Sequence, residues 1–328
     1  MKYFPKKLTM TWIRNSYKEG SLTPEELAGE IVRRAEKYRD YNIWIVAPDL
    51  KRMMGYIEKL PKDMESLPLW GIPFAVKDNI DVAGSPTTAA CPDYAYDPKE
   101  DAAVVKKLIG AGAFPVGKTN LDQFATGLVG TRSPYGEVKN ALDPELISGG
   151  SSSGSAVSVA LGMAAFSLGT DTAGSGRVPA ALNCLVGYKP SLGAWSTKGV
   201  VPACASLDCV TVFANSLEDA EKVNLAARGV DEECCWSREY KEPLPKLPKK
   251  ICLAKDGVTF YGPYEDIYKA KWEQAKKRIE DMGITVEYID YTMFSKAASI
   301  LYDGPWVAER WKDLGDFVES HPGKVFPV

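Results

Sequence analysis

Residues 148–181 read SGGSSSGSAVSVALGMAAFSLGTDTAGSGRVPAA and decide the fold of this chain of 328 residues. The stretch begins with paired glycines and a run of serines, continues with small apolar residues in a helix-then-strand pattern, and returns to glycine, threonine and serine. A flexible Gly/Ser linker would lack the apolar blocks. We therefore expect a serine-rich turn, a buried helix, a buried strand and a second tight turn before another helix.

Apolar strands alternate with helices on the N-terminal side of this stretch. Residues 71–77 (GIPFAVK) and 114–118 (FPVGK) have the apolar character of buried strands, and residues 102–112 (AAVVKKLIGAG) have that of a helix. The alternation predicts an α/β domain built around a largely buried sheet.

The two ends of the chain extend this pattern. Residues 23–26 (TPEE) form a capping box with proline at the first helical position, so the first 60 residues are predicted to be mainly helical, with a short strand at 43–47. Residues 229–249, with three prolines and many charges, indicate a surface connection. Beyond it the pattern predicts a strand, an amphipathic helix at 265–281, a second strand and helices to the end.

Composition excludes several classes of function. The formal charge of −3 gives no sign of a nucleic-acid or membrane surface, and no apolar run approaches the roughly 20 residues that span a bilayer. No apolar segment of a signal peptide follows the basic N-terminus. We therefore expect a cytoplasmic protein that binds neither nucleic acid nor a membrane. The seven cysteines include no C-x-x-C pair, which favours reduced, buried thiols and argues against a metal site or other cofactor.

His321 is the only histidine, and it lies in a polar S-H-P-G segment near the end of the chain. A Ser-His-Asp or Cys-His mechanism would depend on this one residue, for which an exposed turn is the simpler interpretation. If the protein carries out nucleophilic chemistry, its base must be another residue.

A phosphate-loop pattern, G-x-x-x-x-G-K-T, occurs at residues 112–119. Phosphate binding needs a strand before the loop and a helix that begins at the lysine. Here a predicted helix precedes Gly112, a predicted strand occupies the loop, and Pro115 removes one amide. We interpret Gly112 as a helix C-cap before a buried strand, and we reject nucleotide hydrolysis.

Three other segments suggest chemistry together, although each has a plain structural explanation. Lys77 ends an apolar strand; burial would favour its neutral amine, but many such lysines reach water. The serines of 148–160 line the entry to a helix, where they would serve equally as N-caps. In 169–181 small residues allow amides to converge as an oxyanion hole would require, Ser175 lies between glycines, and Arg177 offers a fork for an anion. The alternative for that segment is a tight turn before a helix.

In order, spacing and detail these segments resemble the amidase signature family over residues 70–215. Two smaller segments agree with it, GKTNLDQFATG at 117–127 and VGYKPSLG at 186–193. The resemblance implies a mixed β-sheet flanked by helices and a Ser-cisSer-Lys triad. Carried over position by position, the triad is Lys77, Ser151 and Ser175. Neutral Lys77 would take a proton through Ser151, and Ser175 would attack an amide carbonyl. The oxyanion hole would be formed by the amides of Thr172, Ala173, Gly174 and Ser175.

A segment near the end, ILYDGPWVAERW at 300–311, resembles that of the allophanate hydrolases within this family. There, a tyrosine and an arginine eight positions later help to bind the carboxylate of the substrate, which implies that role for Tyr302 and Arg310. Gly127 falls at a position that lines the pocket, and Arg177 is our further candidate for substrate binding. A guanidinium matches a carboxylate bidentately, as this planar urea-carboxylate requires. A core helix with Arg310 in a surface pair is the structural alternative.

The sequence departs from the family pattern in a few places. Residues 139–148 lack a proline and an aromatic residue that are common there, and Cys184 stands where asparagine is common. Family domains also usually continue well beyond this C-terminus. We therefore predict one amidase domain over 1–328, truncated at its C-terminus, with an N-terminal helical segment (1–60), a signature core (70–215) and a substrate-specificity segment (250–328).

The resemblance leads us to expect a homodimer, with a partner chain that supplies the missing part as an alternative. The main functional hypothesis is hydrolysis of allophanate with release of ammonia in urea breakdown. The alternatives are another amidase, such as the glutamine-hydrolysing subunit of a tRNA amidotransferase, and an inactive truncated subunit.

Overall fold

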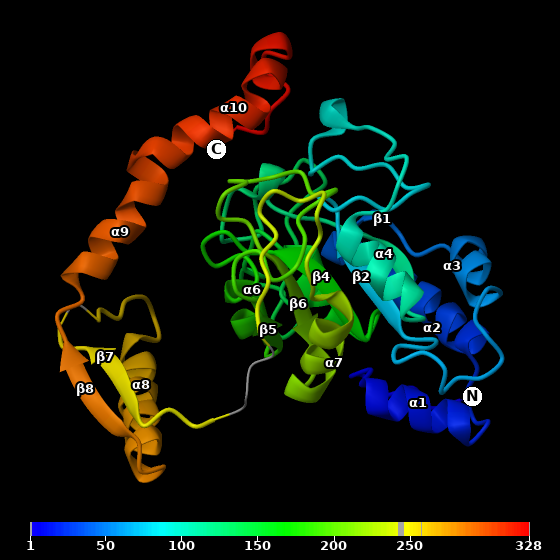
Figure 1. Ribbon diagram of the computed structural model, residues 1–328, viewed down its shortest axis with the longest axis horizontal. Coiled ribbons are helices and arrows are strands. Elements are labelled where there is room, and N and C mark those ends of the chain that lie inside the picture. Colours follow the sequence, from blue (N-terminus) through cyan, green and yellow to red (C-terminus); the bar gives the residue numbers. More distant parts are fainter. Residues whose placement is uncertain (1, 242–245, 257, 328) are drawn as a thin grey trace. The chain divides into compact units, whose positions relative to one another are not determined.

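The computed structural model describes residues 2–241, 246–256 and 258–327, without the side chains of 302 and 303. Contacts divide the chain into two compact units: unit 1 is Met1–Tyr240 with Lys312–Val328, and unit 2 is Lys241–Trp311. Figure 1 shows both, and each is described by itself. The division falls within the proline-rich connection predicted at 229–249, and it also cuts the predicted specificity segment after Trp311. The organisation of 1–328 as a single domain stays a prediction.

Unit 1 is built around a mixed sheet of six strands (Figure 1). At its centre β2 pairs in parallel with both β3 and β4, while β1, β5 and β6 pair antiparallel with their neighbours. The prediction of an α/β fold with a mixed sheet is confirmed. In spatial order the strands are β1 (Trp44–Val46), β3 (Phe114–Thr119), β2 (Pro73–Lys77), β4 (Phe166–Thr170), β6 (Val210–Ala214) and β5 (Val186–Tyr188).

Helices flank this sheet. Helix α5 packs on the central strands, and α4 and α7 pack against each other as well as on β3 and β6. The helices of unit 1 are α1 (Met10–Lys18), α2 (Pro24–Lys37), α3 (Leu50–Ile57), α4 (Ala103–Gly110), α5 (Ser153–Ala160), α6 (Val178–Leu182) and α7 (Leu217–Ala227), with 3₁₀ turns at Arg39–Tyr41, Pro92–Tyr94 and Gln123–Ala125. The predicted order of turn, helix, strand and turn over 148–181 is therefore confirmed.

Helix α2 begins at the predicted capping box. The Thr23 hydroxyl accepts from the Glu26 amide at 3.3 Å, and the Glu26 carboxylate accepts from the Thr23 amide at 3.0 Å. Leu27 and Ile31 then lie buried on one face of the helix, and Ala35 is partly buried. A cap of this kind stabilises a helix by roughly 1 kcal/mol, and it fixes where the buried face starts.

The central strands are buried along their whole length, as their continuous apolar sequence predicts. The rings of Phe74 on β2 and Phe166 on β4 stack with centroids 5.2 Å apart and planes within 4° of parallel. Burial of each ring contributes about 1.5–3 kcal/mol. Because Lys77 ends β2 between two paired strands, its side chain starts from the middle of this core.

The order of elements around the phosphate-loop pattern is the reverse of a nucleotide site. Helix α4 ends at Gly110, and residues 114–119 lie in β3. Gly112 has φ +94°, and a Cβ there would lie 2.8 Å from the Trp70 Cα. The glycine is needed for a turn that passes close to another part of the backbone. The C-cap residue of α4 is Ala111, and Gly112 follows it directly in the turn between the helix and the buried strand.

Unit 2 contains a parallel pair of strands with a connecting helix. Strand β7 (Lys250–Ala254) pairs with β8 (Thr285–Ile289), and α8 (Glu265–Asp281) joins them. Helix α9 (Thr292–Asp303) follows, and α10 (Pro305–Ser320) begins in unit 2 and continues into unit 1. The predicted strands and the helix at 265–281 are confirmed.

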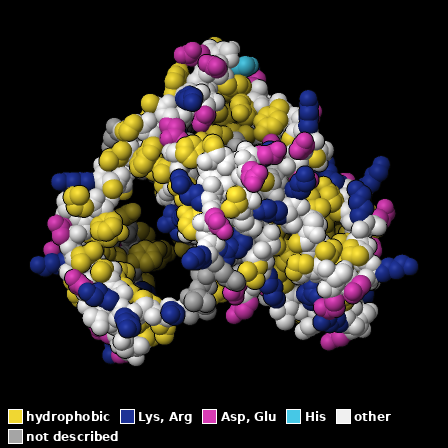
Figure 2. Space-filling model, in the orientation of Figure 1, with side chains coloured by type: hydrophobic (Ala, Val, Ile, Leu, Met, Phe, Trp, Pro, Cys, Tyr) yellow, Lys and Arg dark blue, Asp and Glu magenta, His cyan; other side chains and the backbone are white. Residues whose placement is uncertain are grey.

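Surface chemistry and the free thiols test several of the smaller expectations. On the face shown in Figure 2, basic and acidic side chains are interspersed over unit 1. No helix among the described residues is both long and apolar enough to cross a bilayer. His321 is exposed after α10, as expected. All seven cysteines are free, but the expectation of burial is wrong for three of them, which are exposed: Cys184, Cys235 and Cys252.

Candidate active site

The Lys77 side chain is fully buried at the end of β2. Its Nζ donates to the Ser151 Oγ at 2.8 Å and to the Thr170 Oγ1 at 2.7 Å. Two neutral hydroxyls thus contact the amine directly, and they favour its charged form less than a carboxylate would.

Burial lowers the pKa of Lys77 from its ordinary value of 10.5 to about 7, against the opposing charges of Asp122, Asp208 and Asp171. Desolvation penalises the ammonium form, and no carboxylate bonds to this nitrogen among the described residues. A substantial share of the protein therefore holds a neutral amine near pH 7. Such an amine can accept a proton from a neighbouring hydroxyl.

Ser151 lies in the glycine-rich turn that leads into α5. The Gly150–Ser151 peptide bond is cis, the configuration that the family resemblance implies. Both glycines before it are required by close approach: a Cβ on Gly149 would lie 2.9 Å from the Pro179 Cα, and one on Gly150 would lie 2.1 Å from an Asp122 carboxylate oxygen. The turn is therefore packed too tightly to move Ser151 away from Lys77 without a larger rearrangement.

Ser175 lies in the turn between β4 and α6 and is 6% exposed. Its hydroxyl donates to the Gly127 carbonyl at 3.4 Å, a long bond. Among the described residues its hydroxyl makes no hydrogen bond to Ser151. The structure therefore brings Ser175 together with Gly127, and Ser151 together with Lys77, while the bond between the two serines is not made in this state.

The turn around Ser175 is held by Asp171. Its Oδ1 accepts from the Gly174 amide at 2.6 Å, and its carboxylate binds the Arg177 guanidinium at 2.8 and 3.0 Å. The fork of Arg177, which we expected to face the substrate, is thus bound to a neighbour in the same turn. Its role in substrate binding stays a prediction.

The same contact bears on the predicted oxyanion hole. Because the Gly174 amide is engaged by Asp171, the remaining candidate donors are the amides of Thr172, Ala173 and Ser175. Thr172 is fixed from a second direction, since its hydroxyl donates to the Asp208 carboxylate. That carboxylate also accepts from the Ala203 amide at 2.8 Å. Two buried carboxylates therefore set the shape of this turn.

Gly127 lies over a third buried carboxylate, Asp122. Asp122 accepts from the amides of Gly130 at 3.1 Å and Arg132 at 2.9 Å. A Cβ on Gly127 would lie 2.6 Å from its Oδ2. Only glycine fits between Asp122 and the carbonyl that receives the Ser175 hydroxyl.

The C-terminal segment supports this loop. Within unit 1, Phe317 packs edge-to-face against Phe124 with centroids 6.0 Å apart, and the Phe326 amide donates to the Gln123 Oε1 at 2.7 Å. Leu314 packs in the same cluster. The end of α10 and the residues after it therefore hold the loop that leads to Gly127.

The two predicted carboxylate-binding residues belong to unit 2. The side chain of Tyr302 lies outside the described residues. Arg310 lies in the part of α10 that belongs to unit 2. The roles of Tyr302 and Arg310 stay predictions.

Sequence analysis missed four residues that shape the site. Thr170, Asp171 and Asp122 lie inside segments already singled out, G-T-D and GKTNLDQ, so polarity at the end of a buried strand was an available signal. Asp208 could be identified only from the pairing of two strands. Because Thr170 on β4 pairs antiparallel with Val210 on β6, Thr172 and Asp208 lie opposite each other just beyond that pair.

With this geometry in place, the comparison with known families identifies the class. The model of the family described as Amidase matches residues 26–320. The chain belongs to this family.

Three relatives place the chain within it. Urea amidolyase of Saccharomyces cerevisiae is 47% identical over 288 residues, which are 86% of this chain and 16% of that protein. The solved allophanate hydrolase of Kluyveromyces lactis is 42% identical, with a TM-score of 0.87 over 97% of this chain and 53% of that one. A glutamyl-tRNA(Gln) amidotransferase subunit of Methanosarcina mazei is 35% identical over 90% of this chain and 62% of that protein. The chain thus spans about a sixth of the urea amidolyase and about half of the solved allophanate hydrolase.

Proposed function

We propose that this chain is an amidohydrolase that hydrolyses allophanate and releases ammonia, through Ser175, Ser151 and Lys77. The observation that carries the proposal is the buried Lys77 amine, 2.8 Å from the Ser151 hydroxyl and with a pKa of about 7. A base of this kind can replace the histidine that the site lacks. The similarity to the allophanate hydrolase of K. lactis supports the substrate.

The first step activates the nucleophile. The Ser175 hydroxyl leaves its long contact with Gly127 and donates to the Ser151 Oγ, while Ser151 passes its own proton to the neutral Lys77 amine. Catalytic hydrogen bonds are often unformed in the free enzyme and tighten only with substrate. A new bond then forms between the Ser175 Oγ and the amide carbonyl carbon of the substrate.

The second step expels ammonia. Negative charge on the carbonyl oxygen is stabilised by the amides of Thr172, Ala173 and Ser175, an effect worth about 3–4 kcal/mol for a single donor in well-studied cases. The proton held by Lys77 returns through Ser151 to the leaving nitrogen, and the C–N bond breaks. An acyl ester on Ser175 remains.

Water completes the cycle by the reverse path. It attacks the acyl carbonyl and gives its proton to the relay, and the ester bond to Ser175 breaks as the serine regains a proton. The organic product is the dicarboxylated amine that corresponds to allophanate. No redox cofactor is required by this balance, since only protons and acyl groups move.

Recognition of the substrate carboxylate is assigned to Tyr302 and Arg310. Support for both residues comes from the similarity to the allophanate hydrolase of K. lactis, because a guanidinium and a phenol suit the carboxylate of such a substrate. Gly127 is proposed to line the pocket beside Ser175, whose hydroxyl donates to its carbonyl.

We further propose that the protein works in the cytoplasm as a homodimer. The mixed surface charge in Figure 2 favours a small-molecule substrate over nucleic acid. Light scattering of the purified chain tests the dimer. A monomer that becomes active only with a second polypeptide would favour the alternative of a partner chain.

The decisive experiment measures ammonia release by this chain from allophanate and from glutamine in parallel. Ser175→Ala is the test variant, and Ser191→Ala, which alters an exposed serine, is the matched control. We expect release from allophanate, loss in Ser175→Ala of at least roughly 10³-fold, and no change in Ser191→Ala.

Each alternative predicts a different result. A preference for glutamine would overturn the substrate and favour the amidotransferase-like function suggested by the M. mazei relative. Equal rates in the wild type and Ser175→Ala would overturn the triad. No release from either amide, by a protein with intact secondary structure, would favour an inactive subunit.

A further inference from the structure

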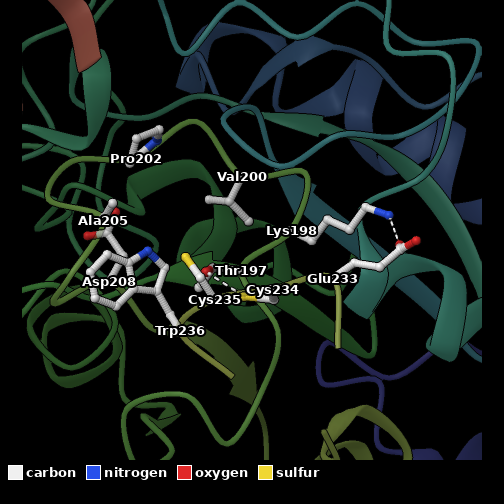
Figure 3. Close-up of a pocket in the computed structure, with 10 residues that line it drawn as sticks. All are labelled: Thr197, Lys198, Val200, Pro202, Ala205, Asp208, Glu233, Cys234, Cys235 and Trp236. Carbon is white, nitrogen blue, oxygen red and sulfur yellow. Dashed lines mark hydrogen bonds and ion pairs between the residues drawn. The ribbon is translucent and has the colours of Figure 1, made fainter. Parts of the chain in front are cut away.

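A cavity in unit 1 contains a pair of adjacent thiols that the proposed reaction does not use. The cavity has a volume of about 210 Å³, and Cys234 and Cys235 both line it. Trp236 and Asp208 line the cavity, as do Lys198 and Glu233, whose ion pair is drawn in Figure 3. We refer to this cavity as the thiol pocket.

Cys234 is only 9% exposed, and its thiol lies next to a hydrogen-bonding group. Its Sγ lies 3.5 Å from the Thr197 hydroxyl, the contact drawn in Figure 3. Burial raises the pKa of this thiol, but the neighbouring hydrogen-bonding groups, the Thr197 side chain first among them, outweigh burial, and the pKa of Cys234 is lowered. Polar donors in a cavity thus favour a thiolate, which is the nucleophilic form of cysteine.

The other wall of the thiol pocket leads to the turn around Ser175. Asp208 lines the cavity, and its carboxylate accepts the Thr172 hydroxyl and the Ala203 amide. Asp208 is 4% exposed, so it cannot turn to water without breaking these bonds. A group that fills the cavity and presses on Asp208 would therefore shift Thr172, a candidate oxyanion donor.

We propose that the thiol pocket is a modification site for small planar α,β-unsaturated carbonyl compounds, with Cys234 as the nucleophile, and that an adduct there slows acyl transfer at Ser175. The flat Trp236 indole offers an apolar wall for a planar compound. The thiol loses its proton to solvent, the sulfur forms a bond to the β-carbon, the C=C π bond breaks, and the α-carbon takes a proton from water. The second clause of this proposal rests on the proposed hydrolase function, and the first does not.

The first experiment maps the site without any measurement of activity. The full chain is treated with limiting N-ethylmaleimide at pH 7.5, and the labelled cysteines are quantified by peptide mass spectrometry. Cys184 and Cys252, both exposed, are internal references. We expect Cys234 to be labelled first, despite its burial. Labelling of Cys234 no faster than that of Cys252 would overturn the site.

A matched pair of variants tests the role of the hydroxyl. Thr197→Val removes the hydroxyl and keeps the shape, and Thr197→Ser keeps the hydroxyl. One hydrogen bond corresponds to about a fivefold change, so Thr197→Val should slow labelling of Cys234 by about that factor while Thr197→Ser stays near wild type. Equal rates in the two variants would show that the thiol is not activated as we infer.

The second experiment tests the coupling to Ser175. Ammonia release and the labelling of Ser175 by a fluorophosphonate are both measured before and after treatment with N-ethylmaleimide. Because small displacements of catalytic groups are costly, both rates should fall roughly tenfold in wild type, and Cys234→Ser should protect both. Labelled Cys234 with unchanged rates would overturn the coupling. Absence of ammonia release from untreated protein would count against the proposed function alone, because the fluorophosphonate and the mapping experiment still report on the thiol pocket.

Discussion

The two units of this chain differ sharply in how their strands are covered. In unit 1, β2 and β4 are buried at every position, and Lys77 is enclosed with them. In unit 2, β7 and β8 contain no fully buried residue, and neither does α8. A lysine can be held neutral only where water is excluded, so the proposed proton transfer requires the first environment. Recognition of a carboxylate by a long side chain does not.

This difference predicts a division of kinetic effects. Changes in the buried centre of unit 1 should lower kcat or unfold the protein. Changes on the surface of unit 2 should leave the fold intact and act on KM.

The largest expected effect is that of Lys77→Met. The variant keeps the apolar stem and removes the base, so kcat should fall by roughly 10²- to 10⁴-fold. Ammonia release under saturating allophanate measures it, and circular dichroism monitors the fold. Lys106→Met, at an exposed lysine, is the control and should be unchanged. A variant without Lys77 that retains more than a tenth of the rate would place the base elsewhere.

Loss of a central ring should have the next largest effect. Phe74→Ala removes the stacked partner of Phe166 from a fully buried strand and should lower the free energy of unfolding by about 3–5 kcal/mol. Tyr268→Ala, on the exposed face of α8, should change it by less than about 0.5 kcal/mol. Denaturation by urea measures both. Comparable losses would contradict the contrast between the units.

The pH dependence of the rate provides a sharper test of burial. The pKa of Lys77 is lowered to about 7, and the neutral amine is the active form. The value of kcat/KM should therefore be nearly constant well above pH 7 and should fall about tenfold for each unit of pH below it. Stopped assays between pH 5 and pH 9 measure this limb. His321→Gln, which removes the only histidine of the sequence, is the control. A fall in kcat/KM that shifts in the His321→Gln variant, or that is centred close to pH 10, would contradict the inference that burial lowers the pKa of Lys77.

The predictable part of this site consists of residues that local segments of the sequence identify. Lys77, Ser151 and Ser175 were assigned through the resemblance of three local segments to the amidase signature family, because glycines, small residues and a strand-end lysine are features that the sequence shows directly. The bond from Thr172 to Asp208 was not, because it depends on the antiparallel register of β4 with β6. For Arg177 the sequence indicated a guanidinium that would bind an anionic group, and the structure places it on the carboxylate of Asp171, six residues away in the same turn, while its role in substrate binding stays a prediction. Composition indicates which group a side chain can bind, whereas only the fold decides which partner is nearest.

The smallest expected effect lies in unit 2, at Arg310. Arg310→Gln removes a guanidinium from the proposed carboxylate site, and a charged hydrogen bond of this kind corresponds to roughly a ten- to hundredfold change in KM. Since the substrate carboxylate does not change during acyl transfer, kcat should change little. Biuret, the neutral amide analogue of allophanate, is the matched substrate, and the variant should discriminate against allophanate but not against biuret. Lys312→Gln, an exposed neighbour on the same helix, is the control variant. An equal loss with both substrates would mean that Arg310 supports the fold of α10. Another cationic side chain would then have to bind the substrate carboxylate, and Arg177 would be the first candidate.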